Sequence, residues 1–122
     1  MKAVLTLLVA AAAGCSGSGM GSAVRSDVSL RMASVQQPIS TCYEQALQRN
    51  RKLRGRMTLS FHAAPGTGKF SDVRVVESEL ADPELERCVV GHVGSLTLAQ
   101  PQKTAIAVSY PLNFTPQDAA GR

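Results

Sequence analysis

The 122-residue sequence contains no tryptophan, and aromatic residues make up only 4% of it. Surfaces that bind single-stranded nucleic acid depend on aromatic side chains on which the bases stack. The formal net charge of +4 is mild, which favours solubility and a weak attraction to anionic surfaces without indicating a nucleic-acid partner. We therefore expect a protein that does not bind nucleic acid.

Patterns typical of a catalytic site are missing as well. No Ser/His/Asp order and no paired acid cluster stands out in the sequence. Segment 66–69 (Gly-Thr-Gly-Lys) superficially resembles a phosphate-binding loop, but Ala63 stands where the first glycine is required and Phe70 where serine or threonine is required. We expect a hairpin turn there, and we expect no catalytic residue, no cofactor and no enzymatic activity.

Long hydrophobic runs are limited to the start of the chain. Lys2 precedes an uncharged run from Ala3 to Ala13, and this order is typical of an export signal peptide. The run is too short for a permanent transmembrane helix, which needs about 20 apolar residues.

The residues Ala12-Ala13-Gly14-Cys15 resemble a bacterial lipobox. The resemblance implies removal of residues 1–14 and acylation of Cys15, whose acyl chains would hold the protein in a membrane. Because Ser16 rather than aspartate follows, similarity to enterobacterial lipoprotein sorting implies the outer membrane, on the periplasmic side of the cell envelope. The alternative is an ordinary signal peptide, whose cleavage leaves a protein without lipid.

The remaining chain divides into three parts. Residues 15–37 begin with a glycine- and serine-rich stretch and are expected to form a flexible tether. Residues 23–37 have a mixed character, and the alternative for them is a lead into the first helix. Residues 38–114 contain the periodic apolar patterns of one small domain. Residues 115–122 are expected to form a disordered tail.

Two helices and a hairpin are predicted within the domain. Apolar residues recur at helical spacing from Pro38 to about Asn50, and again after residues 82–84 (Asp-Pro-Glu), which make a strong helix start. Between the helices, alternating polar and apolar residues in 57–61 and 70–77 predict two strands joined by a turn.

The last strand is predicted from Thr104 to Phe114. It contains Pro111, which lacks an N–H group and therefore indicates a strand at the edge of a sheet. A right-handed crossover through the second helix would place this strand beside the first strand and parallel to the second. We therefore expect an α+β fold of order α-β-β-α-β, with a small three-stranded antiparallel or mixed sheet and two helices on one of its faces.

Cys42 and Cys88 lie on the apolar stripes of the two predicted helices. In an oxidising compartment such a pair favours a disulfide between the helices, which would stabilise the fold by about 4 kcal/mol in the chain-entropy model. The alternative is a pair of buried free thiols. A zinc site that adds His92 is a weaker alternative because no fourth ligand is evident, and we expect no metal.

The paired Cys42 and Cys88, the Asp-Pro-Glu helix start and the Tyr-Pro pair of the last strand are distinctive in combination. Together with segments 39–47, 55–61 and 70–78 they resemble a TonB-like C-terminal domain of the AgmX/PglI type over residues 38–114. The resemblance implies a periplasmic module that binds other envelope proteins, linked with gliding motility or with TonB-type transport machinery. Because the long proline-rich spacer of TonB is absent, we expect an adaptor.

Strand pairing with an envelope protein is the leading hypothesis for binding. An exposed edge offers unpaired N–H and C=O groups that an extended peptide can complete. The candidate edge lies in the last strand and comprises Thr104, Ile106, Val108, Tyr110 and Leu112. Pro111 removes one donor from this strand, as proline does in protected edges, so an edge that binds nothing is one alternative. The same edge could also pair with a second copy, so a homodimer is an alternative, as is a purely structural envelope lipoprotein.

A basic cluster supports a second hypothesis. It follows the first predicted helix and consists of Arg49, Arg51, Lys52, Arg54 and Arg56. Such a cluster could dock on anionic lipid or on a cell-wall polymer. Cations also suit the negative end of a helix dipole, so part of the cluster has a structural explanation.

Overall fold

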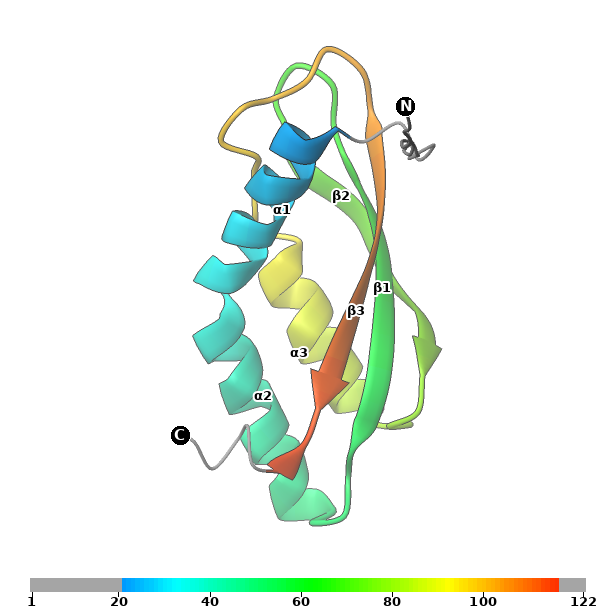
Figure 1. Ribbon diagram of the computed structural model, residues 1–122. Helices are drawn as coiled ribbons and strands as arrows, with labels where there is room; N and C mark the ends of the chain where they lie inside the picture. Colours follow the sequence, from blue (N-terminus) through cyan, green and yellow to red (C-terminus); the bar gives the residue numbers. More distant parts are fainter. Residues whose placement is uncertain (1–20, 117–122) are drawn as a thin grey trace, which may run out of the picture.

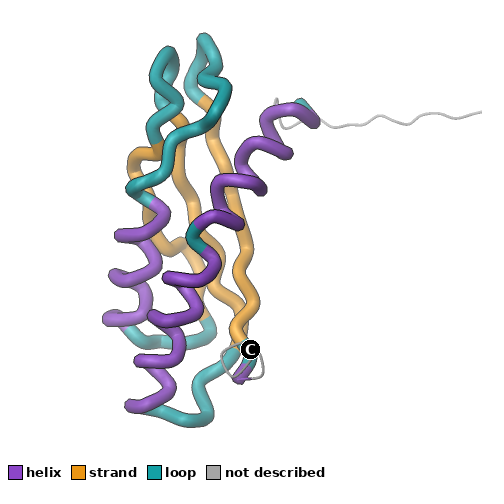
Figure 2. Tube along the Cα trace, turned by 90° about the vertical axis from the view of Figure 1, so that its left-hand side faces the viewer, coloured by secondary structure: helices purple, strands orange, loops and turns teal. Residues whose placement is uncertain are grey.

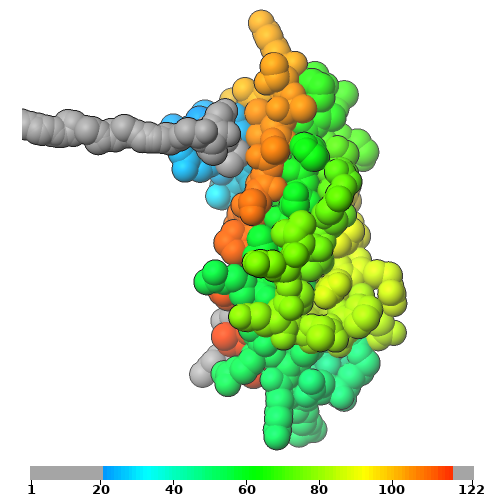
Figure 3. All heavy atoms as spheres, turned by 90° about the vertical axis from the view of Figure 1, so that its right-hand side faces the viewer, coloured from blue at the N-terminus to red at the C-terminus, as the bar shows by residue number. Residues whose placement is uncertain are grey.

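A computed structural model describes residues 21–116, which form a layer of helices packed on one face of a small antiparallel sheet (Figure 1). The helices are α1 (Ser22–Ser34), α2 (Gln36–Arg49) and α3 (Pro83–Val93). The strands are β1 (Gly55–Ala63), β2 (Phe70–Ser78) and β3 (Ile106–Phe114). Figure 2 views the molecule from the side of the helices, and Figure 3 views the opposite, uncovered face of the sheet.

The sheet has the strand order β2-β1-β3, and β1 pairs antiparallel with both neighbours. A hairpin joins β1 to β2, and the crossover through α3 carries the chain back to the far side of β1. This arrangement confirms the predicted α+β fold and the placement of the last strand beside the first. It also leaves β2 and β3 as the two edges of the sheet.

The core is built on the alternation of β1. Met57, Leu59, Phe61 and Ala63 face the helices and are almost completely buried, whereas the residues between them reach the uncovered face. Each large apolar side chain that is buried in this way stabilises the fold by about 1.5–3 kcal/mol. The helices α2 and α3 pack further buried side chains into this core, among them Tyr43, Ala46, Leu85, Val89 and Val93.

The helix α1 corrects the expectation of a flexible tether over residues 15–37, which is wrong from residue 22 onward. Val24, Val28 and Met32 follow one another at intervals of four residues and form a buried stripe on α1. Asp27, on the same side, accepts hydrogen bonds from the backbone N–H groups of Ala99 and Gln100 at 3.1 and 2.9 Å. The carboxylate therefore fastens α1 to the loop between α3 and β3.

Some helix and strand boundaries in the structure differ from those predicted from the sequence. The helix α2 begins at Gln36, so that Pro38 falls in the first turn, where the backbone N–H groups have no partner within the helix. Asn50 follows the last residue of α2, as predicted. Thr104 lies outside β3, which begins at Ile106.

Several predictions fall outside the described residues. The signal peptide, the acylation of Cys15 and the tail beyond residue 116 belong to this group. Within residues 21–116, no helix is long and apolar enough to cross a membrane.

Replacement of Asp27 by Ala tests the attachment of α1. The change leaves two backbone N–H groups without their acceptor, and we expect it to lower the free energy of unfolding by about 1–3 kcal/mol. Urea unfolding followed by circular dichroism measures the effect. Glu44→Ala, an exposed position on α2, is the control and should change stability by less than about 0.5 kcal/mol. Equal effects of the two changes would contradict the role assigned to Asp27.

Candidate functional site

The two edges of the sheet differ in regularity. The pairing of β1 with β2 shifts register twice, and at each shift β2 carries one residue more than β1. Asp72, at one of these bulges, has a φ of 55°, which is rare for a residue other than glycine. Bulges twist a strand and are one of the devices by which proteins protect an edge from further pairing.

The β3 edge has no such interruption. Its ladder with β1 runs without a shift from the pair Gly55–Phe114 to the pair Ala63–Ile106. A regular strand turns the backbone groups of every second residue toward its open edge, as an incoming strand requires. The β3 edge is therefore the better candidate for strand pairing.

The direction of the backbone groups of β3 follows from β1. Glu79 donates its backbone N–H to the carbonyl of Arg56, and Ala64 donates its N–H to the carbonyl of Lys69, so that Arg56 and Ala64 point toward the β2 side. Successive residues of a strand point to opposite neighbours. The residues of β1 with odd numbers therefore point toward β3.

The same alternation assigns the residues of β3. Ile106, Val108, Tyr110, Leu112 and Phe114 lie opposite the odd-numbered residues of β1, so their backbone groups turn toward β1. The residues between them turn their backbone groups toward the open edge, and their side chains are exposed: Ala107, Ser109, Pro111 and Asn113. Pro111 thus removes a donor from the open edge and none from the ladder with β1.

The edge residues predicted from the sequence have a different role. Of these residues, Val108 is buried, whereas Ile106, Tyr110 and Leu112 are half-buried and pack against the core. They form an apolar border beside the edge, whereas the alternate residues present the backbone groups. The prediction selected residues by their hydrophobicity, and the period of two along the strand was the signal that would have identified the alternate set.

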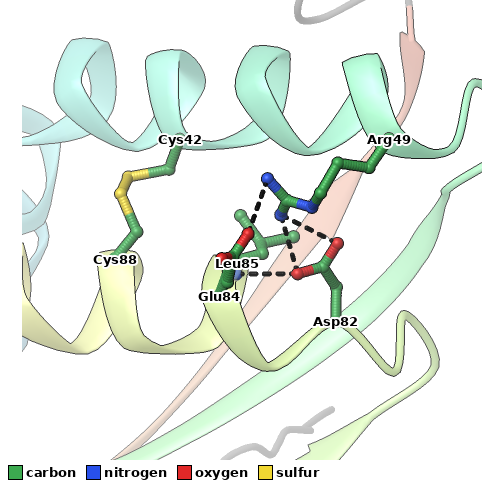
Figure 4. A network of polar contacts seen from close by, with 6 residues as sticks. All are labelled: Cys42, Arg49, Asp82, Glu84, Leu85 and Cys88. Atoms are coloured by element: carbon green, nitrogen blue, oxygen red, sulfur yellow. Dashed lines mark hydrogen bonds and ion pairs between the residues drawn. A yellow bond between two sulfur atoms is a disulfide. The ribbon is translucent and has the colours of Figure 1, made fainter.

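In the structure, Arg49 has a different role from the other members of the basic cluster. Arg49 binds both oxygens of the Asp82 carboxylate, at 2.8 and 3.0 Å, and lies 2.9 Å from Glu84 (Figure 4). It therefore belongs to the contact between α2 and α3. The other members are exposed and make no ion pair with any residue in 21–116: Arg51, Lys52, Arg54 and Arg56. Three of them belong to the loop between α2 and β1, which lies at the end of the molecule opposite the start of α1 (Figure 1).

Asp82 also caps α3, because its carboxylate accepts a hydrogen bond from the backbone N–H of Leu85 at 3.0 Å. Burial opposes the ionised form of Asp82, but the hydrogen bonds from Leu85 and Arg49 outweigh it and hold the pKa of this carboxyl below its usual value. The helix start that the sequence predicted is thus confirmed in detail.

The disulfide between Cys42 and Cys88 is confirmed. The two Cα atoms lie 6.0 Å apart, within the usual range for a disulfide. The bridge joins α2 to α3 along the same contact as Arg49 and Asp82, as Figure 4 shows.

One histidine–aspartate pair lies on the uncovered face of the sheet. The Nδ1 atom of His62 lies 3.6 Å from Oδ2 of Asp72, and the other carboxylate oxygen of Asp72 accepts a hydrogen bond from Arg74. The hydrogen bond from Arg74 lowers the pKa of Asp72. In the described part of the chain, no hydroxyl or thiol hydrogen-bonds to His62, so this pair lacks the nucleophile that a catalytic triad requires.

The pH dependence of stability tests the cap of α3. Because the pKa of Asp82 is lowered by folding, its ionised form stabilises the protein above the unfolded pKa, and this contribution is lost as the pH falls through the folded value. Asp82→Ala should cost about 1 kcal/mol near pH 7. The difference from wild type should shrink below about pH 4. Asp82→Asn keeps a capping oxygen and should cost less. Urea unfolding at several pH values measures the free energy of unfolding of each variant and of wild type. A difference between Asp82→Ala and wild type that stays constant down to pH 2 would contradict the stabilising role of the ionised carboxylate.

No protein-family model and no curated protein matches the sequence. Among solved structures, the fold is similar to the solution structure of the TonB C-terminal domain of Helicobacter pylori, residues 179–285. The TM-score is 0.59 at 18% identity, over 80% of this chain and 84% of that one. A shorter piece of the same domain, residues 194–285, gives a TM-score of 0.48 at 18% identity, over 70% and 94% of the two chains. The first of these matches shows that the chain has the fold of a TonB C-terminal domain.

Proposed function

We propose that the protein is a lipid-anchored adaptor of the cell envelope that binds an extended segment of a partner protein by strand addition to β3. The observation that carries the proposal is the difference between the two edges, since β3 has an unbroken ladder and β2 has two register shifts. Ala107, Ser109 and Asn113 supply outward N–H groups, and the half-buried Ile106, Tyr110 and Leu112 lie next to them. A strand that pairs here gains backbone hydrogen bonds and apolar contacts together.

The TonB-like fold supports a role as a protein-interaction module of the envelope. The resemblance of residues 38–114 to the AgmX/PglI type extends the proposal to gliding motility or TonB-type transport machinery. Pairing of two β3 edges would produce a homodimer, and this is the main competitor of a foreign strand for the same site.

Attachment through Cys15 would place the domain close to the membrane. The chain between Cys15 and Gly21 spans at most about 20 Å when fully extended. The helices α1 and α2 follow one another end to end and contain 13 and 14 residues, which corresponds to about 40 Å. The loop that follows α2 and carries exposed cations lies at the far end of these helices (Figure 1). This geometry favours contact of the exposed cations with a cell-wall polymer over contact with the lipid that holds Cys15. The second hypothesis is therefore limited to docking on a cell-wall polymer.

Photo-crosslinking in cells tests the proposed strand pairing. A photoreactive residue at Asn113 or Ala107 on the β3 edge should crosslink to one envelope protein, identified by mass spectrometry. The matched control carries the same residue at Val76, an exposed position on β2. Equal crosslinking from both strands would contradict the proposal, and a product of twice the mass of the protein would indicate the homodimer.

Ser109→Pro should abolish this crosslink while the domain stays folded. The change removes the outward N–H in the middle of the edge, and the tolerated Pro111 two residues away shows that a proline with this orientation fits β3. Ser109→Ala keeps the N–H group and should bind like wild type. Thermal unfolding of both variants checks their stability. Crosslinking that survives in the folded proline variant would count against pairing at this edge.

Mass spectrometry of the mature protein from its membrane fraction tests the anchor. We expect cleavage before Cys15 and a mass that includes acyl chains, with a gain of about 2 Da on reduction of the disulfide. Cys15→Ser should lose the acyl mass and leave the membrane fraction. A mature wild-type protein without added lipid mass would contradict the anchor and leave the fold unaffected.

A further inference from the structure

Three potential metal ligands converge where α2 meets α3. Cys42 lies on α2, whereas Cys88 and His92 lie one turn apart on α3. The sulfur atoms and an imidazole nitrogen all lie within 4.8 Å of one another. Cys88 and His92 are half-buried, and Cys42 is buried. The cluster is separate from the β3 edge and has no part in the proposed strand pairing.

The geometry is close to what a tetrahedral metal needs. Zinc binds thiolate sulfur at about 2.3 Å and imidazole nitrogen at about 2.0 Å, which places neighbouring ligand atoms about 3.6 Å apart. Ligand atoms within 4.8 Å of one another reach this spacing through small rotations of the side chains. Two thiolates and one imidazole form a ligand set that suits zinc.

In the oxidised protein the two sulfur atoms are bonded to each other and are not available as thiolates. A dithiol that reduces the bond supplies two electrons and two protons, becomes a disulfide itself, and leaves two cysteine thiols. Binding of a divalent metal then releases these two protons, because the ligands are thiolates.

We propose that reduction of the Cys42–Cys88 disulfide turns this contact into a zinc site formed by Cys42, Cys88 and His92. The sequence argued against a metal because it offered no fourth ligand, but a site with three protein ligands and an open position is a common arrangement. A surface groove of about 460 Å³ runs beside both cysteines. It gives water or a small ligand access to the fourth position.

Metal binding would maintain the contact between α2 and α3 after reduction of the disulfide. The metal would join α2 to α3 at the same place as the disulfide. The site therefore preserves the link between the two helices under reducing conditions.

Cobalt serves as the spectroscopic probe in the test. The full-length chain carries Cys15→Ser, so that Cys42 and Cys88 are its only thiols, and it is reduced and freed of reductant. We expect one equivalent of Co²⁺ to produce a thiolate-to-metal charge-transfer band that Zn²⁺ abolishes. The oxidised protein should show no band. Zn²⁺ should also raise the melting temperature of the reduced protein, because it binds the folded state.

His92→Ala should weaken Co²⁺ binding by at least tenfold, because it removes one of three ligands. His62→Ala is the matched control, since His62 is the other histidine of the chain and lies on the sheet face away from α2 and α3, and it should bind like the parent. Absence of the band, equal affinity of the two histidine variants, or a reduced protein that stays unfolded in the presence of metal would each overturn the proposal.

Discussion

The burial of one face of β1 is the constraint on which the rest of the structure depends. Its inward side chains are buried in one core with residues of the three helices, and both of its edges are paired. A sheet of three strands around such a centre has two outer edges, and each must be protected or used. The register shifts protect β2, whereas β3 keeps a regular ladder. The candidate binding edge is thus a consequence of how the core is covered.

The contact between α2 and α3 fixes the layer that covers the core. The disulfide joins the two helices near their middle, and Arg49 bridges the end of α2 to the capped start of α3. A domain of this size buries a modest core and benefits from such links. Because α3 is also the crossover that brings β3 beside β1, this contact helps to determine where the open edge lies.

Local signals in the sequence predicted those parts of the fold that depend on nearby residues. Asp82 and Pro83 predicted the start of α3, and Pro111 predicted an edge strand. The helix α1 was missed because it lacks a side-chain cap and an acidic first turn, and because Asp27 is buried only where a distant loop supplies its hydrogen-bond donors. The bulges of β2 depend on backbone geometry at positions such as Asp72, for which the sequence carries no clear signal.

Hydrogen exchange of the β3 amides is the most direct test of the account, because it reports on each backbone N–H group separately. In the free protein, the amides of Ile106, Val108, Tyr110 and Leu112 should exchange slowly, whereas those of Ala107, Ser109 and Asn113 should exchange rapidly. A bound partner strand should slow the second group. Two results would contradict the assignment of β3 as the open, partner-binding edge. One is slow exchange of all β3 amides in the free monomer, and the other is a partner that slows the exchange of β2 amides instead.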